Sequence, residues 1–169
     1  YIGYDSISGD YNIASVEEDS SSIYGGGIAE LSNGIIIGGG ISFGKFDTIH
    51  RPASSITGGN RDTFGGLLGY RSGSFIATAT IAQSKTDGDL RKTHANLGGI
   101  TSSASLESKQ TAGKLALRYV KKSGDFTFTP HISLMAIDTT LDGFSETGGD
   151  VLGITSDGYS GTSYLSDLS

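Results

Sequence analysis

The sequence has no cysteine, only two prolines and no run of eighteen apolar residues. Without cysteine the chain has neither a disulfide framework nor a thiol-based metal site. Without a long apolar run it has no transmembrane helix, since such a helix needs about 20 apolar residues. The longest apolar windows are broken by glycine, as in Ile35, Ile36 and Ile37 followed by three glycines.

Positive charge is also scarce. Twelve Lys and Arg stand against eighteen Asp and Glu, a formal net charge of -6. Nucleic acid is therefore not an expected partner, because phosphate binding needs a positive surface.

Motifs of catalysis and metal binding are missing as well. His50, His94 and His131 stand far apart with no carboxylate at ligand spacing. There is no nucleophile elbow, and the glycine-rich stretches precede strands rather than a helix, which argues against a phosphate loop. We expect no enzymatic activity, no catalytic residues, no metal and no cofactor.

What the sequence does contain is regular alternation. In residues 125–138, Phe126, Ile132 and Leu134 fall on one face, while His131 and Ser133 fall on the other. A period of two residues predicts a β-strand. The segment is far longer than an ordinary strand of about five or six residues, and its length suits a tilted strand that crosses a bilayer.

Other segments repeat this pattern. We predict further strands at residues 35–45, 63–71, 74–85 and 109–121, and a less clear first strand within residues 11–31. Residues 72–73 and 122–124 form short turns, whereas residues 46–62 and 86–108 are expected to be long polar loops. Short turns alternating with long loops are typical of outer-membrane barrels. We divide the chain into a poorly assigned lead-in, residues 1–34, and a barrel domain, residues 35–169.

The two faces of these strands differ in polarity. In a barrel the apolar face contacts lipid, and the opposite face lines a polar lumen. The candidates for lumen-facing residues are Arg71, Lys114, Arg118 and His131. A soluble sandwich with the apolar face as its core gives the same pattern, so alternation alone leaves both folds open.

The order of several motifs resembles a known family. Leu115 to Tyr119 closes one strand, a Thr-Pro pair at Thr129 and Pro130 lies in the next, and a segment follows that contains Asp142, Gly143, Phe144 and Glu146. From about residue 35 onward this resembles the C-terminal translocator domain of autotransporters, the type V secretion proteins. The resemblance implies a structural role for Glu146 near the barrel mouth.

Membership of this family would imply an all-β fold, an antiparallel up-and-down transmembrane β-barrel of twelve strands. Six or seven of those strands are expected in this chain. The closing strand of the family is not found before Ser169, which we interpret as a truncation. The first ten residues lack the features of a signal peptide, which we expect to have been removed or to lie outside this sequence.

The resemblance implies a translocator or anchor in the outer membrane of a Gram-negative bacterium, which helps to display an N-terminal passenger domain on the cell surface. The implied partners are membrane lipid, the passenger or linker segment of the same polypeptide, the outer-membrane insertion machinery, and the rest of the barrel in the same or another chain. The alternatives are a porin-like channel and a soluble all-β binding or adhesive domain.

Overall fold

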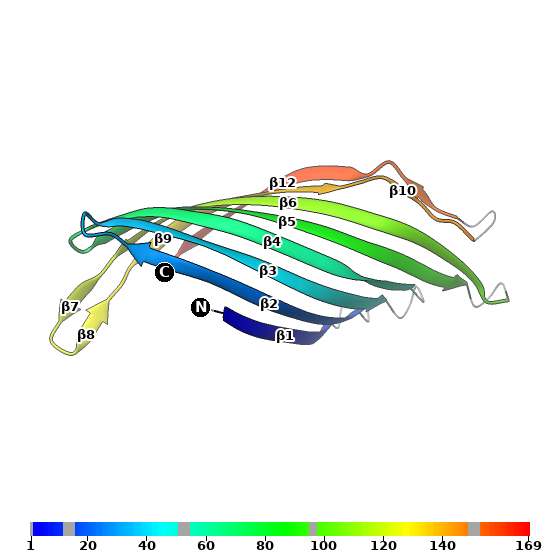
Figure 1. The fold of residues 1–169 in the computed structure, drawn as a ribbon, viewed down its shortest axis with the longest axis horizontal. Helices are drawn as coiled ribbons and strands as arrows, with labels where there is room; N and C mark the ends of the chain where they lie inside the picture. The colour runs from blue at the N-terminus through cyan, green and yellow to red at the C-terminus, as the bar shows by residue number, and fades with distance from the viewer. Residues whose placement is uncertain (1, 12–15, 51–54, 95–97, 149–152) are drawn as a thin grey trace.

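The protein is described by a computed structural model that covers residues 2–11, 16–50, 55–94, 98–148 and 153–169. Its main feature is one curved antiparallel sheet of eight strands, drawn as an arch in Figure 1. In spatial order the strands are β1 (Ile2–Tyr11), β2 (Val16–Glu30), β3 (Ile35–His50), β4 (Ser55–Ser72), β5 (Phe75–His94), β6 (Ile100–Tyr119), β9 (His131–Leu141) and β12 (Tyr159–Leu168).

The connectivity is up-and-down, because each of these strands pairs with the next one along the chain. Two small ribbons accompany the sheet: β7 (Lys121–Ser123) pairs with β8 (Phe126–Phe128), and β10 (Phe144–Ser145) pairs with β11 (Thr155–Ser156). The all-β, antiparallel architecture is confirmed. The main sheet holds eight strands rather than the expected six or seven, and β1 and β12 form its two open edges.

Both predicted short turns are present but displaced along the chain: Ser72, Lys122 and Ser123 belong to strands, and the turns lie at residues 73–74 and 124–125. Ser72 pairs with Phe75 around a turn that contains Gly73, and Ser123 pairs with Phe126 around Gly124. Gly73 has a φ of 57° and Gly124 a φ of 61°, a backbone conformation that glycine adopts without steric cost. Among the described residues no helix is long and apolar enough to cross a membrane.

The prediction of long loops at residues 46–62 and 86–108 is wrong. Most of both segments belongs to strands: β3 and β4 pair from Ile35 with Tyr70 to His50 with Ser55, and β5 and β6 pair from Phe75 with Tyr119 to His94 with Ile100. These stretches look like loops in the sequence because polar residues occupy both faces of the strands. Their ladders of backbone hydrogen bonds need no apolar face.

The single strand expected at residues 125–138 is divided. β8 and β9 are separated by Thr129 and Pro130, and Pro130 has no N–H to donate to the ladder. Opposite it, the amide of Tyr119 still donates to the carbonyl of Pro130 at 3.0 Å, so one bond of the pair is kept and the other is lost. The register does not change across the interruption, because Arg118 pairs with His131 and Lys121 pairs with Phe128.

The sheet has almost no conventional core. In the part of the chain that the structure describes, the buried apolar residues are Ile36 and Ala104, and many large apolar side chains are exposed. A soluble sandwich buries such side chains between two sheets about 10 Å apart. The apolar face of this sheet therefore needs a partner other than the chain itself.

Candidate lipid-facing belt and inner face

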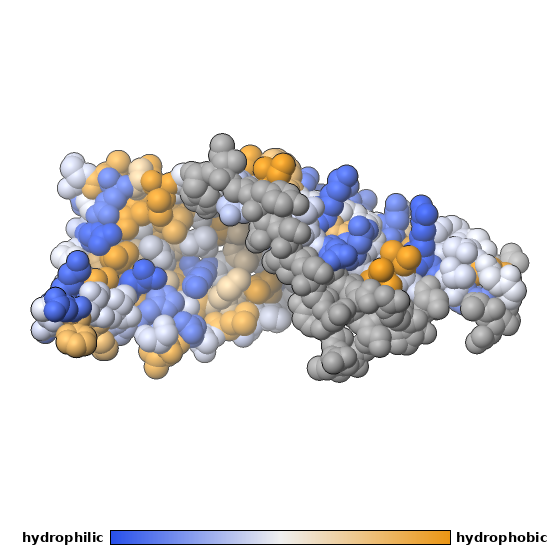
Figure 2. All heavy atoms as spheres, turned by 90° about the horizontal axis from the view of Figure 1, so that it is seen from below, coloured by the Kyte–Doolittle hydropathy of each residue, from blue (hydrophilic) through white to orange (hydrophobic). Residues whose placement is uncertain are grey.

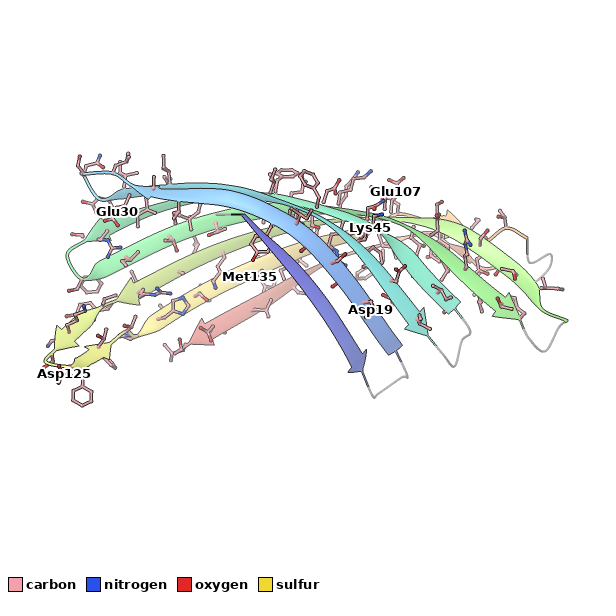
Figure 3. All side chains as sticks on the ribbon, turned by 60° about the horizontal axis from the view of Figure 1, so that its bottom comes forward. Asp19, Glu30, Lys45, Glu107, Asp125 and Met135 are labelled. Atoms are coloured by element: carbon pink, nitrogen blue, oxygen red, sulfur yellow. The ribbon has the colours of Figure 1, made fainter. Side chains whose placement is uncertain are left out.

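The register sorts the side chains onto two faces, because directly paired residues in an antiparallel sheet share a face. Ile37, Leu68, Ala79, Leu115 and Leu134 form one cross-strand row, on what we call the outer face. The neighbouring row, on the inner face, contains Gly38, Leu67, Thr80, Lys114 and Met135. Figure 3 shows side chains on both faces of the curved sheet, with Glu107 on the convex side.

A band of exposed apolar side chains crosses the outer face, and we call it the belt. Leu68 is 61% exposed and Leu115 is 63% exposed. The belt also contains the exposed residues Ile23, Ile37, Ile41, Phe43, Phe64, Tyr70, Phe75, Ile81, Leu117, Ile132, Leu134, Tyr164 and Leu168, and the half-buried Tyr119.

The height of the belt can be worked out along β6. Leu115, Leu117 and Tyr119 share the outer face with Lys109, which marks the polar limit. Ten residues at about 3.4 Å each span roughly 34 Å along the strand. At the tilt of about 40° that strands have in outer-membrane barrels, the distance from Lys109 to Tyr119 corresponds to a height of about 26 Å, enough to contain an apolar band of about 25 Å.

Aromatic rings lie at the short-turn end of the belt. The rings of Phe75 and Tyr119 are 4.7 Å apart between centroids, and Tyr70 is exposed nearby on the same face. Amphipathic rings at this level are typical of the girdles that border a membrane.

Charged residues replace apolar ones beyond the other end of the belt. Lys85 Nζ lies 2.9 Å from Asp87 and 3.8 Å from Glu107, and all three are exposed on the outer face. The hydrogen bond and charge of Asp87, with a smaller effect of Glu107, raise the pKa of Lys85 above its usual value. These three charged side chains mark the polar border of the belt.

The four predicted lumen candidates lie on the inner face by register. Arg71, Arg118 and His131 belong to one cross-strand row, linked through Ile76. Lys114 lies on the same face, four residues from Arg118 along β6. That this face lines a lumen stays a prediction. Figure 2, seen from below the arch, shows hydrophilic side chains interspersed with apolar ones.

Two of these residues contact carboxylates at the short-turn end. Arg71 Nε donates to Glu30 at 2.7 Å, which joins the turn after β2 to the turn after β4. His131 Nδ1 lies 3.2 Å from the Asp167 carboxylate, which joins β9 to β12. The Arg71–Glu30 pair is about 40% exposed, and such surface pairs contribute about 0–1 kcal/mol.

Small residues make a smooth patch at the middle of the inner face. Gly26, Gly40, Gly65, Ala82 and Ala112 form one cross-strand row. A Cβ on Gly26 would lie 2.6 Å from the carbonyl oxygen of Gly39, and one on Gly65 would lie 2.8 Å from that of Ile81. Because these residues have small side chains or none, the middle of the inner face has space that larger side chains would fill.

The predicted loop motif folds as a bulged extension of the β9–β12 hairpin. The amide of Asp142 donates to Glu107 at 2.9 Å, and Phe144 pairs with Ser156 across β10 and β11. Gly143 fits closely, since a Cβ there would lie 2.9 Å from the carbonyl oxygen of Ser156.

The Glu146 side chain holds this extension against the first residues of β6. Its carboxylate accepts a hydrogen bond of 2.8 Å from Ser102, which has no exposed surface, and Ser102 also lies 3.5 Å from His94 Nε2. Thr147 exchanges backbone hydrogen bonds with Ser103. Sequence reasoning suggested no contact for Ser102 or His94. Ser102 is 44 residues from Glu146 along the chain, and Ser102 and His94 both lie in residues 86–108, which were expected to form a loop.

An aromatic contact on the inner face was also missed. The Arg61 guanidinium lies 5.3 Å from the Phe46 ring centroid, a cation–π contact. The tip of the Phe46 ring lies over Gly88, where a Cβ would be 3.4 Å away. In the sequence, Phe46 stands at the start of a predicted loop, so nothing signalled its neighbours.

Comparison with known proteins identifies the family. The family model of the autotransporter β-domain matches residues 1–168, and the chain therefore belongs to this family. The match includes the lead-in, residues 1–34. No curated protein matches the chain.

A solved structure supports the fold. The translocator domain of the autotransporter NalP from Neisseria meningitidis superposes with a TM-score of 0.79 at 11% sequence identity. The alignment covers 90% of this chain and 53% of that one, so the chain spans about half of the matched translocator domain. The family is one of transport and membrane-anchor domains rather than of enzymes.

Proposed function

We propose that this chain forms part of an outer-membrane barrel that helps to export an N-terminal passenger domain and anchors it at the cell surface of a Gram-negative bacterium. The observation that carries the proposal is the belt itself, a continuous band of exposed apolar side chains on one face of the sheet, which lipid would cover. Membership of the autotransporter family supports the same role.

The open edges fit a partial barrel. β1 and β12 each leave a row of backbone groups without a neighbouring strand in the eight-stranded sheet. Within hydrocarbon each unpaired group costs several kcal/mol, so membranes are crossed by closed barrels. We propose that further strands, in the same polypeptide or another chain, pair with both edges.

The inner face suits a lumen that holds a passenger or linker segment. The row of Gly26, Gly40 and Gly65 leaves room at its middle, and Arg71 and Arg118 supply polar groups at the short-turn end. The insertion machinery of the outer membrane would act on the barrel before export. This arrangement needs no catalytic residue or cofactor in the barrel.

Surface display of the passenger tests the proposal. In cells that express the full-length protein, protease added from outside should remove the passenger and leave a membrane-embedded fragment that contains residues 1–169. A passenger that stays protected in intact cells, while the barrel inserts normally, would contradict export and favour the porin-like alternative.

A further inference from the structure

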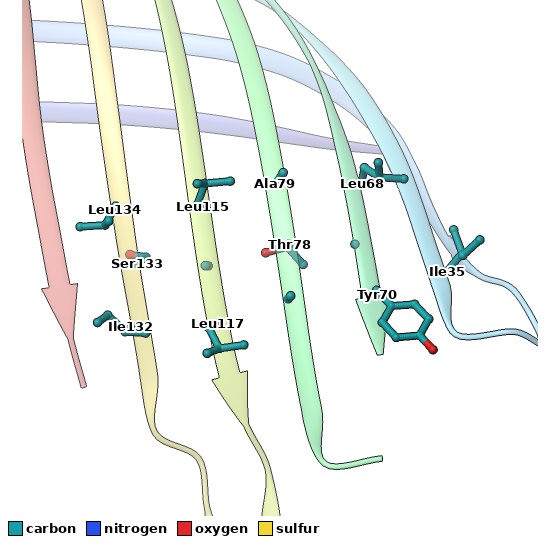
Figure 4. Close-up of a pocket in the computed structure, with 13 residues that line it drawn as sticks. Ile35, Leu68, Tyr70, Thr78, Ala79, Leu115, Leu117, Ile132, Ser133 and Leu134 are labelled. Carbon is teal, nitrogen blue, oxygen red and sulfur yellow. The ribbon is translucent and has the colours of Figure 1, made fainter. Parts of the chain in front are cut away.

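An open groove of about 640 Å³ lies within the belt, on the half nearer the short turns. Its floor is lined by Ala77 and Ala79 of β5, and Figure 4 shows Ala79 between Leu68 and Leu115 of the neighbouring strands. Leu68 and Tyr70 of β4 form one wall and Leu115 of β6 contributes to the other. The groove exists because β5 carries alanine on the outer face where its neighbours carry leucine and tyrosine.

The side chains that line the groove on the outer face are apolar or aromatic. The groove continues past Leu117 to Ile132 and Leu134 of β9, and it borders Thr78 and Ser133, whose side chains belong to the inner face by register. Volumes of this order are typical of sites for small molecules, which occupy about 300–1,000 Å³. A flexible hydrocarbon chain fits an elongated apolar groove of this kind.

A cationic side chain lies beyond the short-turn end of the groove. Lys121 pairs with Phe128 in the β7–β8 ribbon, in the same register as β6 and β9. By alternation from Leu117 through Tyr119, Lys121 belongs to the outer face. It is four residues from Leu117, or about 14 Å along the strand.

Lys121 suits an anionic group at the membrane surface. It is exposed, and none of the ion pairs found among the described residues includes it. Its position two residues beyond Tyr119 is about 5 Å below the belt after tilt, within the headgroup layer of about 5–7 Å. Phe128, which is 66% exposed, lies on the same side of the ribbon.

We propose that this part of the outer face binds one anionic phospholipid. An acyl chain lies in the groove over Ala77 and Ala79, and the phosphate contacts Lys121. The inference rests on the proposed function, because it requires the belt to face lipid. The β7–β8 ribbon that carries Lys121 continues the register of β6 and β9, which line the groove, so the cation lies about 14 Å from Leu117 along the strand direction.

The neighbouring Lys122 provides a matched control. It pairs with Thr127 and therefore lies on the opposite side of the ribbon from Lys121 and Phe128. Replacing Lys121 should affect the lipid, whereas replacing Lys122 changes the net charge equally without touching the site. For the groove, Ala79→Leu fills the floor, and Ala29→Leu adds the same bulk to the outer face outside the groove.

The test uses the folded full-length protein in detergent micelles, titrated with dioleoyl phosphatidylglycerol or dioleoyl phosphatidylcholine. Native mass spectrometry counts the lipids that stay bound. We expect one phosphatidylglycerol to be retained about five-fold more strongly than phosphatidylcholine, the preference that one lysine near a surface supplies. Lys121→Gln should remove that preference, and Ala79→Leu should remove the bound lipid.

Three results would overturn the site, the first two of which concern the headgroup and the third the groove. One is equal retention of the two lipids by the unchanged protein, and another is identical behaviour of Lys121→Gln and Lys122→Gln. The third is loss of lipid in Ala29→Leu as well as Ala79→Leu, which would contradict a defined groove. Heat-modifiable migration on a gel, measured in parallel, separates the two proposals: a folded barrel without a lipid preference refutes the site alone, whereas a protein that forms no barrel refutes both.

Discussion

A positive charge placed in the belt should destabilise the inserted barrel. Leu115 lies on the outer face of β6 and is 63% exposed. The belt runs from Lys109 to Tyr119 on this strand, so Leu115 is within one residue, about 3 Å, of its middle. We predict that Leu115→Arg lowers the free energy of unfolding of the inserted protein by about 2–4 kcal/mol, the cost of arginine near the midplane of a bilayer barrel.

This cost corresponds to a change of roughly 30- to 700-fold in the folding equilibrium. The assay is urea titration of the full-length protein in phospholipid vesicles, followed by heat-modifiable migration. Ser105→Arg is the matched control, because Ser105 lies on the same strand and face, about 34 Å along the strand from Leu115. Equal destabilisation by the two substitutions would refute the assignment of the belt to lipid.

Three further predictions concern close contacts and polar pairs, each measured by the same urea titration. Gly59→Ala should destabilise by about 1–3 kcal/mol, because its Cβ would overlap the backbone of β5, whereas Gly27→Ala, with open space around its Cβ, should be nearly neutral. Ser102→Ala should cost about 1 kcal/mol by removing the hydrogen-bond donor to Glu146, and should speed amide exchange in β10. Arg71→Gln should cost less than about 1 kcal/mol, since its ion pair is half exposed.

Each of these predictions has its own contradictory result. Equal urea midpoints for the Gly59 and Gly27 variants would show that the strands separate easily at Gly59. Unchanged amide exchange in β10 after Ser102→Ala would show that Glu146 does not hold the extension. A loss of several kcal/mol in Arg71→Gln would mean that this side chain has a buried partner in the complete barrel.

The strands within the belt could be predicted from the sequence because one face is apolar there. Leu115 and Leu117 alternate with Lys114 and Arg118, and the structure keeps that alternation on two faces. The hairpin around Gly73 was also predictable, since a two-residue connection between alternating runs leaves few other geometries.

Outside the belt the same reasoning fails for a physical reason. Where both faces meet water, as around Asp87 and Asp89, a strand carries no apolar period and reads as a loop. β2 was hard to define because glycines at 25–27 occupy both of its faces. The sequence prediction placed Pro130 inside a continuous strand. Proline has no backbone N–H, so it interrupts the hydrogen bonds between strands unless it lies at a sheet edge or a bulge.

The candidate site was only partly accessible to sequence reasoning. Alternation assigned Arg71, Lys114, Arg118 and His131 to a common face, as their register now indicates. The Ser102–Glu146 contact depends on a bulge after Leu141 that shifts the chain against β6, and no local pattern encodes such a shift.

The central claim is that the belt faces lipid, and the behaviour of the native full-length protein tests it most directly. Extracted from its membrane, the protein should require detergent to stay in solution and should migrate faster on a gel before heating than after. A protein that remains soluble and monodisperse without detergent, with no change of migration on heating, would contradict the account.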